Sequence, residues 1–239
     1  MNSLMRSLKG FTFNNKHNKN FGTVMHSKSI QPPSKKKIKE SVPFMDGSYD
    51  FSTVGSNGEI NYNERVITIV LGLPADSKER LQIMYSKVLE WLMDSGQCRL
   101  IFDDDPMYYY VAEVEQTSTF EQVMEFGRLT VTFTAEPFKS SINYMVDDIW
   151  DIFNFEEDVV QELQFNVETT KAISIYNAGR ITTPTINVDS ELSIVSKGVT
   201  YTLLSGDNTF YDLKLYHGYN DMVINGNGNI KFLFRKQVM

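Results

Sequence analysis

Apolar and polar positions alternate along much of the chain, as they do in short strands with one buried face. In residues 127–138, GRLTVTFTAEPF, the apolar side chains of Leu129, Val131 and Phe133 alternate with threonines. Successive side chains of a strand point to opposite faces of the sheet, so this period of two predicts a half-buried strand. Pro137 follows the alternation and is predicted to end the strand, because proline has no backbone N–H to donate.

One stretch has helical periodicity instead, residues 75–96, ADSKERLQIMYSKVLEWLMDSG. Asp76 is placed to cap the N-terminus of a helix, Glu79 follows at the capping-box spacing, and Gly96 is placed to end it. The predicted helix should pack on a sheet through apolar positions that recur at three and four residues and so share one face: Leu81, Met84, Tyr85, Val88, Leu89 and Leu92.

Further strands are predicted before residue 139. The β-branched run NERVITIVLGL, residues 63–73, is typical of a strand. Two more strands are predicted at QCRLIF and MYYYVAEVEQ, joined by a turn at Asp103–Pro106. With the helix packed on these strands, residues 1–139 are predicted to form an N-terminal β-sandwich domain.

The chain changes character over residues 139–165, which hold seven carboxylates and read as a linker that opens a second domain. Beyond it the chain is again rich in short apolar segments separated by Gly, Asn and Asp turns, a spacing typical of a β-sandwich. Residues 140–239 are therefore predicted to form a second, C-terminal β-sandwich, and the fold class to be mainly β. The predicted segments are AISIYNAG, TPTINV, LSIVSKG, VTYTLLSG, DLKLYHG, DMVING and IKFLFRK.

Composition narrows the classes of function. The formal net charge of −7 over 239 residues argues against general nucleic-acid binding, which needs a basic surface. The single cysteine, Cys98, excludes an intramolecular disulfide. The longest apolar run, Val66–Leu73, is too short to cross a bilayer, and residues 1–20 lack the apolar core of a signal peptide. We therefore expect synthesis and folding in a cytosol.

Three consecutive carboxylates, Asp103, Asp104 and Asp105, stand before a run of three tyrosines. Hard cations take several carboxylate oxygens, so a metal site is one interpretation. Adjacent carboxylates on a strand point to opposite faces, however, and an Asp-Pro step between two strands is ordinary turn chemistry. We favour the turn. A glycosidase pair of Asp103 and Asp105 is less favoured still, because nothing else in the chain supports a sugar-cleaving cleft.

Other candidate chemistry is sparse. His17, His26 and His217 are scattered, and none has a metal-ligand spacing to another His or to Cys98. Cys98 is interpreted as a core thiol. The GNGN stretch at residues 226–229 lacks the Lys-Ser/Thr of a phosphate-binding loop and is interpreted as a turn. The residues thus predict no catalytic site, no metal site and no cofactor, and the chain is interpreted as a non-enzyme.

The stretch QPPSKKKIKE, residues 31–40, is predicted to be an exposed loop or an extended hairpin arm. A solvated loop tip is the simplest interpretation of its lysines. A long basic loop in an acidic protein is also a candidate contact with another subunit. The candidate subunit-contact residues are Pro32, Pro33, Lys35, Lys36, Lys37 and Lys39.

The order of features in residues 4–138 resembles the distal tail proteins of siphophages, the phages with long non-contractile tails. The resemblance is carried by GFTFNN, the Pro/Lys arm, DGSYD, the helix end EWL, the DDDP-YY hairpin and the closing EPF. The family usually has glycine at the position of Phe44, so this turn is expected to differ. The resemblance implies a structural virion protein whose N-terminal domains build a hexameric ring.

The resemblance also implies partners and a location. The ring would join the major tail tube protein to the tail-tip hub or tail-associated lysin protein of the baseplate, and receptor-binding proteins could attach outside. The protein would be made in the host bacterial cytoplasm and end at the tip of the virion tail, without contact to a membrane or to a specific nucleic-acid sequence.

The C-terminal part is similar to the family's second domain, a galectin-like or carbohydrate-binding-module-like jelly roll. The resemblance rests on the YNAG turn at residues 176–179, Pro184 and the ending NGNGNIKFLFR. A protein that binds host cell-surface glycans is therefore the alternative function. It would need exposed aromatic side chains along a groove, although the alternation places some of the candidates in the core: Tyr201, Tyr211, Tyr216 and Tyr219.

Overall fold

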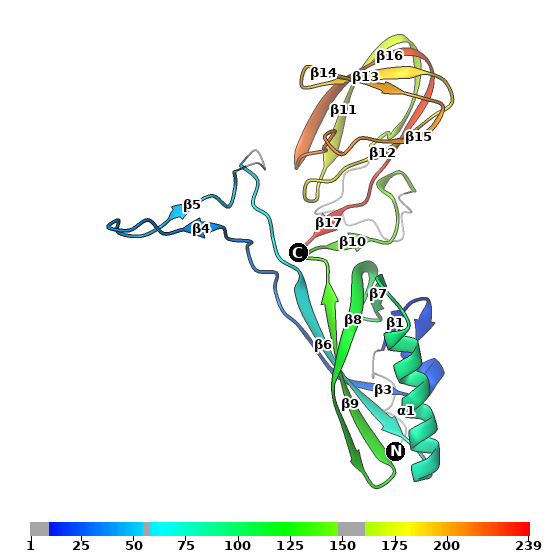
Figure 1. Ribbon diagram of the computed structural model, residues 1–239. Coiled ribbons are helices and arrows are strands. Elements are labelled where there is room, and N and C mark those ends of the chain that lie inside the picture. Colours follow the sequence, from blue (N-terminus) through cyan, green and yellow to red (C-terminus); the bar gives the residue numbers. More distant parts are fainter. Residues whose placement is uncertain (1–9, 55–57, 148–160) are drawn as a thin grey trace. The chain divides into compact units, whose positions relative to one another are not determined.

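The computed structural model describes residues 10–54, 58–147 and 161–239 (Figure 1). Those residues divide into two compact units, of which the first ends at Lys139 and the second spans Ser140–Val238. Within the described ranges the chain is mainly β, with one α-helix, α1 (Lys78–Met93). The predicted fold class, mainly β with one packed helix, is confirmed. Of the acidic linker predicted at residues 139–165, residues 148–160 lie outside the described ranges.

One antiparallel sheet forms the first unit. Its strands lie in the order β2-β1-β7-β8-β9-β6-β3, so strands distant in sequence are neighbours in space. The short 3-10 helix η2 (Asn18–Phe21) lies between β2 and β3. The strand bounds are β1 Phe11–Phe13, β2 Lys16–His17, β3 Val24–Ile30, β6 Arg65–Pro74, β7 Cys98–Phe102, β8 Asp105–Val123 and β9 Phe126–Ala135.

The longest hairpin of this sheet, β8–β9, is only partly as predicted. Leu129, Val131 and Phe133 are fully buried, as the alternation of β9 predicts. Strand β8 continues to Val123, seven residues beyond the predicted end, and pairs there with Phe126. Its last residues mix polar and apolar side chains without clear alternation, so backbone pairing to β9, and not a burial pattern, keeps them extended.

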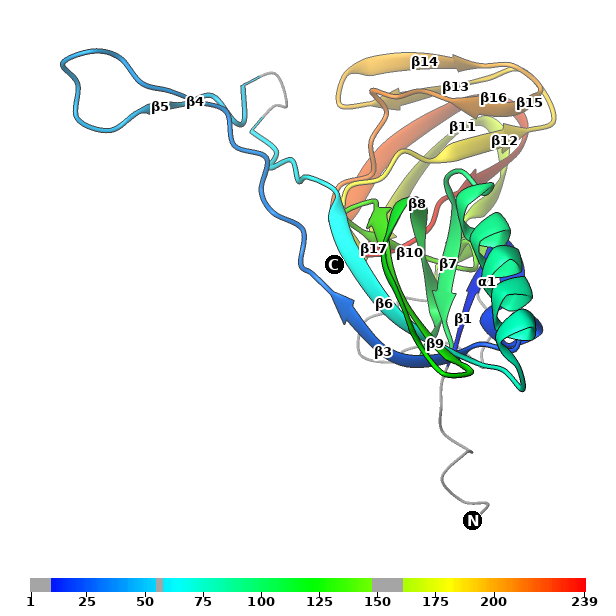
Figure 2. The ribbon, with the colours of Figure 1, turned by 60° about the horizontal axis from the view of Figure 1, so that its bottom comes forward.

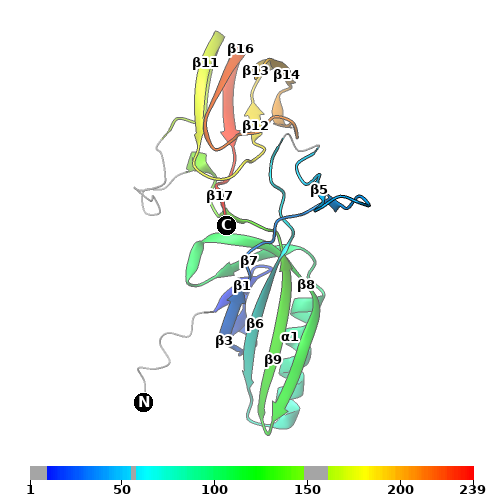
Figure 3. The same cartoon turned by 90° about the vertical axis from the view of Figure 1, so that its left-hand side faces the viewer.

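Helix α1 lies along one face of the sheet, over β6, β8 and β9 (Figure 3). Its predicted cap is wrong by one residue, because the side chain of Ser77 accepts the hydrogen bond from the Arg80 backbone N–H. Asp76 instead forms an ion pair with the Arg80 guanidinium. The helix ends at Met93, three residues before the glycine predicted to end it.

The contact between α1 and the sheet is aromatic. The Trp91 indole stacks on Phe21 with ring centroids 4.4 Å apart and on Phe11 at 5.7 Å. Its Nε1–H donates to the backbone carbonyl of Phe13 at 3.0 Å. Because the indole is 4% exposed, this hydrogen bond satisfies a donor and an acceptor that are both away from water. Trp91 therefore ties α1, η2 and β1 together.

The second unit is also a β structure, with strands in the order β14-β13-β16-β12-β15 and with β11 paired to β16. At the chain ends of this unit, β10 pairs with β17. The short 3-10 helix η3 covers Met145–Asp147. The strand bounds are β10 Lys139–Ser141, β11 Gln164–Asn177, β12 Thr185–Val188, β13 Leu192–Ser196, β14 Val199–Leu203, β15 Gly206–Thr209, β16 Gly218–Leu233 and β17 Gln237–Val238.

Two predictions for this unit are wrong. The segments DMVING and IKFLFRK form one strand, β16, and the GNGN stretch interpreted as a turn stays paired with β11 throughout. Gly226 and Gly228 have φ of 123° and 155°, values that glycine tolerates, so the chain can distort there without leaving the sheet. The segment DLKLYHG forms only an isolated bridge between Leu215 and Thr182.

Candidate functional site

The predicted arm is a hairpin that leaves the first sheet after β3 and returns at β6. Near its base, the Lys36 N–H donates to the Asn61 carbonyl at 2.9 Å and the Asn63 N–H donates to that of Ser34 at 2.8 Å. Further out, β4 (Lys39–Glu40) pairs with β5 (Tyr49–Asp50). Figure 2 shows β4 and β5 side by side and joined by a loop at the far end of the arm. A two-stranded hairpin without a covering layer is marginally stable in water, so such an arm gains from a partner.

The lysines of the arm have different environments. Lys37 donates to the Asp50 carboxylate at 2.7 Å, across the hairpin. Its hydrogen bond, followed by those from Ser52, holds the pKa of the Asp50 carboxyl well below its usual value. Lys35, Lys36 and Lys39 are exposed. Lys37 thus serves the hairpin itself, whereas the other three lysines and the exposed Pro32 present themselves to solvent. Pro33, the last of the six predicted contact residues, is partly buried.

Sequence reasoning concentrated on the lysines and missed the apolar side chains of the same arm. Seven large apolar residues between positions 38 and 60 are exposed. Gly, Ser and Asp residues interrupt the apolar positions of this stretch, so no regular alternation marks them in the sequence. The only sequence signal for them is the high apolar content of a turn-rich stretch. Large exposed apolar patches mark interaction sites in soluble proteins. The seven are Ile38, Val42, Phe44, Tyr49, Phe51, Val54 and Ile60.

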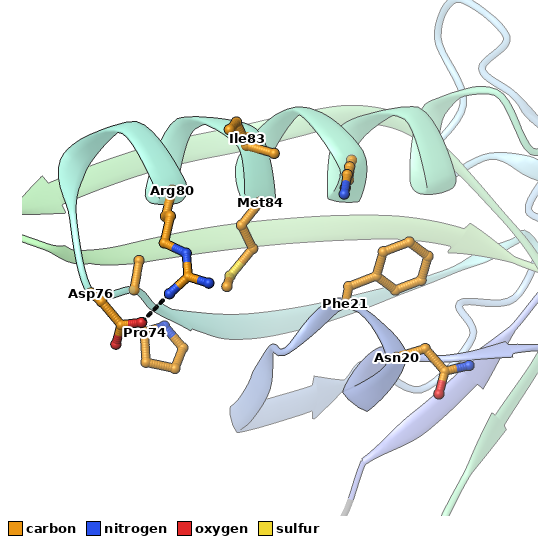
Figure 4. Close-up of a pocket in the computed structure, with 9 residues that line it drawn as sticks. Asn20, Phe21, Pro74, Asp76, Arg80, Ile83 and Met84 are labelled. Carbon is orange, nitrogen blue, oxygen red and sulfur yellow. Dashed lines mark hydrogen bonds and ion pairs between the residues drawn. The ribbon is translucent and has the colours of Figure 1, made fainter.

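A cavity of about 370 Å³ lies between α1 and η2 in the first unit (Figure 4). Figure 4 shows Met84 of α1 and Phe21 of η2 pointing toward the space between the two helices. The apolar lining is Phe21, Pro74, Ala75, Ile83 and Met84, and the polar lining is Asn20, Asp76, Arg80 and Lys87. The Asp76–Arg80 ion pair neutralises one cation, so Lys87 leaves the lining with one net positive charge.

The three aspartates diverge. Asp103 accepts from the Gly10 N–H at 2.7 Å and lies 3.1 Å from Nε2 of His17. Asp104 pairs with Lys28 and Asp105 with Lys139, each at 2.5 Å. Three carboxylates with three different partners do not converge on one ion. The three aspartates therefore have a second role besides forming the turn, because each carboxylate also binds a different segment of the first unit.

The environment of Asp103 sets its pKa. Burial raises the pKa of this carboxyl, but the hydrogen bond from Gly10, the His17 side chain and the charge of Lys19 together lower it below its usual value. The ionised form is thus favoured by the folded state. Because the side chain is about one third exposed, solvent weakens this contribution.

The remaining candidates for metal or catalytic chemistry are dispersed. His26 lies beside Phe126, with ring centroids 5.8 Å apart, and Nδ1 of His217 lies 3.1 Å from the Gly179 carbonyl oxygen. Cys98 is partly buried at the edge of the first core. Across the described ranges, no three His, Cys, Asp or Glu side chains are grouped so that they could hold a metal ion.

The tyrosines proposed as sugar-stacking groups separate into two kinds. Tyr201 is 8% exposed and belongs to the core of the second unit. Tyr211 and Tyr219 are 87% and 73% exposed, and the Tyr219 ring packs edge-on against Tyr176 with centroids 5.0 Å apart. Tyr216 is partly buried beneath the Lys197 ammonium, 3.3 Å from its ring centroid. Two of the four candidates therefore offer an aromatic face to a ligand.

None of the helices in the described ranges is long and apolar enough to span a membrane.

Comparisons with known proteins agree with this architecture. A family model described as phage tail protein RIFT-related domain matches residues 8–135, more than half of the chain, so the chain belongs to this family of structural phage tail proteins. The chain shares the fold of the SPP1 Dit protein, whose crystal structure is described as a paradigm of the hub adsorption apparatus in phages that infect Gram-positive bacteria. The TM-score is 0.66 and the identity 13%, with 97% of this chain and 99% of that chain covered.

Both findings support the resemblance to siphophage distal tail proteins. No curated protein matches the sequence.

Proposed function

We propose that this protein is a distal tail protein that forms a hexameric ring between the phage tail tube and the tail-tip hub of the host-adsorption apparatus. Membership of the phage tail family is the observation that carries the proposal. The fold shared with SPP1 Dit supports it, because the match covers 97% of this chain and so includes both units. In this proposal the first unit builds the ring, and the second is a galectin-like domain.

The proposed role is structural and not enzymatic. Its partners would be other copies of the chain, the major tail tube protein, the tail-tip hub or tail-associated lysin protein and, outside the ring, receptor-binding proteins. The protein would be made in the host cytoplasm and end at the virion tail tip.

The arm, residues 31–63, is the proposed contact with a neighbouring subunit. Its exposed lysines and apolar side chains support this role, because an interface core is apolar and its rim is polar. Replacing Lys35, Lys36 and Lys37 with Glu should weaken the ring. Lys36 and Lys39 as Glu would be the sharper variant, since it leaves the Lys37–Asp50 pair in place. An unchanged assembly state in both variants would show that the charge of the arm does not contribute to assembly.

The mass of the purified protein in solution, measured by light scattering and combined with negative-stain images, tests the ring. Closed rings of six subunits are the expected result. Rings of another order would contradict the hexamer. A monomer at all concentrations would require the same measurement with the tail tube protein added, and a mixture that still gives no ring would contradict the proposal.

A protein that binds host cell-surface glycans is the second candidate function. The exposed rings of Tyr211 and Tyr219 favour it, because sugars stack on aromatic faces. A glycan array tests it, with Tyr211→Ala and Tyr219→Ala as variants and Tyr201→Phe, which keeps the core, as the control. Binding that disappears in the first two variants alone would support this candidate, and the absence of any binding would leave the structural role.

A further inference from the structure

The turn at the end of the arm has a strained backbone conformation, and no contact with the described residues of the same chain compensates for this strain. The Met45 N–H donates to the Val42 carbonyl at 3.3 Å, and Pro43 and Phe44 lie between them. Phe44 has a φ of 68°. Proline at the second position and a positive φ at the third are the pattern of a type II turn, in which the third residue is usually glycine. A bulky residue there is a conformational outlier.

The phenyl group gains nothing from its own subunit in return, because Phe44 is fully exposed. Backbone strain that the fold does not need is found at functional sites, where the strain positions a side chain for a partner. A rigid aromatic side chain held out at the end of a hairpin is the type of group that becomes the buried anchor of an interface.

The cavity between α1 and η2 suits such a group. This cavity is open to solvent, and its volume of about 370 Å³ exceeds the roughly 150 Å³ of enclosed apolar cavities that bind benzene, so it has room for a phenyl group with its adjoining turn. The charges also match. Asp46 is the one charged residue between Ser41 and Ser48 on the arm loop, and the cavity lining has a net positive charge from Lys87.

The arm and the cavity adjoin opposite ends of one strand, β6. The arm joins β6 at its first residue, Arg65, and the cavity is lined by Pro74, its last. Ten residues of strand span roughly 30 Å. An anchor carried by an arm beyond one end of the strand and a cavity near the other end favour a head-to-tail contact between copies, the kind that can close a ring.

We propose that Phe44 inserts into the α1–η2 cavity of a second copy of this chain and is the anchor of the subunit contact. This inference rests on the proposed ring-forming function and deepens it, because it assigns most of the stabilisation of the contact to an apolar anchor and only a smaller part to the lysines of the arm.

Phe44→Gly is a clean test, because glycine accepts the positive φ and should relieve the turn while it removes the phenyl group. The variant should raise at least tenfold the protein concentration at which half of the chains are assembled. The matched control is Met124→Gly, which removes another exposed apolar side chain at positive φ, on the β8–β9 hairpin. Ile83→Asp should weaken assembly from the side of the cavity.

Cross-linking tests the contact itself. In a Cys98→Ala background, and at a concentration at which light scattering shows that the double variant is still assembled, Phe44→Cys combined with Ile83→Cys should react with a short bis-maleimide to give products that join separate chains. The pair of Phe44→Cys with Met93→Cys should not, because the exposed Met93 lies about 15 Å from Ile83 along α1 and outside the cavity lining. Products within one chain, or none between chains, would overturn the anchor.

The outcomes separate the anchor from the ring. If the wild-type protein forms rings and Phe44→Gly assembles at the same concentration, the anchor is wrong and the proposed function stands. If the wild-type protein forms no ring even with the tail tube protein, and the thiol pair gives no product between chains, both fail. Circular dichroism of Phe44→Gly should match the wild type, which shows that the fold is retained.

Discussion

Replacing Trp91 should destabilise the first unit selectively and by a predictable amount. In Trp91→Phe the stacking on Phe21 is kept in part, but the Phe13 carbonyl loses the indole N–H and keeps only its backbone pairing with Lys16. The loss of one intramolecular hydrogen bond costs about 0.5–1.5 kcal/mol. In Trp91→Ala the packing is lost as well, and truncating a buried Trp costs about 3–5 kcal/mol.

The measurement is thermal and urea unfolding followed by far-ultraviolet circular dichroism. The chain has two units, so two transitions are expected, and only the transition of the first unit should move. For a unit of this size, 1 kcal/mol corresponds to roughly 4 °C in the unfolding midpoint. Trp91→Phe should therefore lower that midpoint by about 2–6 °C. Equal shifts of both transitions, or no shift in Trp91→Ala, would refute the reasoning.

Three further substitutions test local features of the first unit by urea unfolding. Ser77→Ala should cost about 1 kcal/mol through the lost helix cap, whereas Asp76→Ala should be nearly neutral because its ion pair is exposed; the reverse order would refute the assignment of the cap. Gly127→Ala should cost about 1–3 kcal/mol, since its Cβ would lie 2.8 Å from the Phe120 ring, and a neutral result would mean that the ring moves aside freely. Asp103→Asn should destabilise at pH 7 and have little effect near pH 2: the lowered pKa means that the carboxylate stabilises the fold above about pH 4 and loses this contribution as pH falls through the folded-state pKa. An equal effect at both pH values would show that charge is not the cause.

The sequence predicts those parts of the fold that depend on local pattern. The periodicity of apolar residues predicts which face of β9 and which face of α1 is buried, because a half-buried element needs apolar residues only on its buried face. It does not predict the length of β8 or the continuity of β16, because Val123 and Gly226 stay in strands through pairing with distant partners. Pairing between residues far apart in sequence leaves little local signal.

The candidate site shows the same limit for a different reason. The arm is recognisable from its prolines and lysines, whose chemistry is visible residue by residue. The role of each side chain depends on what lies opposite: Lys37 faces Asp50 and so belongs to the hairpin, although its neighbours in sequence face solvent. The cavity is not predictable in this way, since Phe21, Pro74 and Met84 come from three elements that only the fold brings together.

The arm itself sets two contributions to assembly against each other, and their magnitudes decide between them. An exposed ion pair contributes about 0–1 kcal/mol and is screened by salt. Burying a Phe side chain contributes about 1.5–3 kcal/mol, and salt does not screen it. An interface held by Lys35, Lys36 and Lys39 should therefore dissociate as salt rises, whereas one held by Phe44 should persist. Assembly measured by light scattering from 50 mM to 1 M NaCl separates the two: a ring that persists at high salt favours the apolar anchor, and one that dissociates assigns the contact to the lysines.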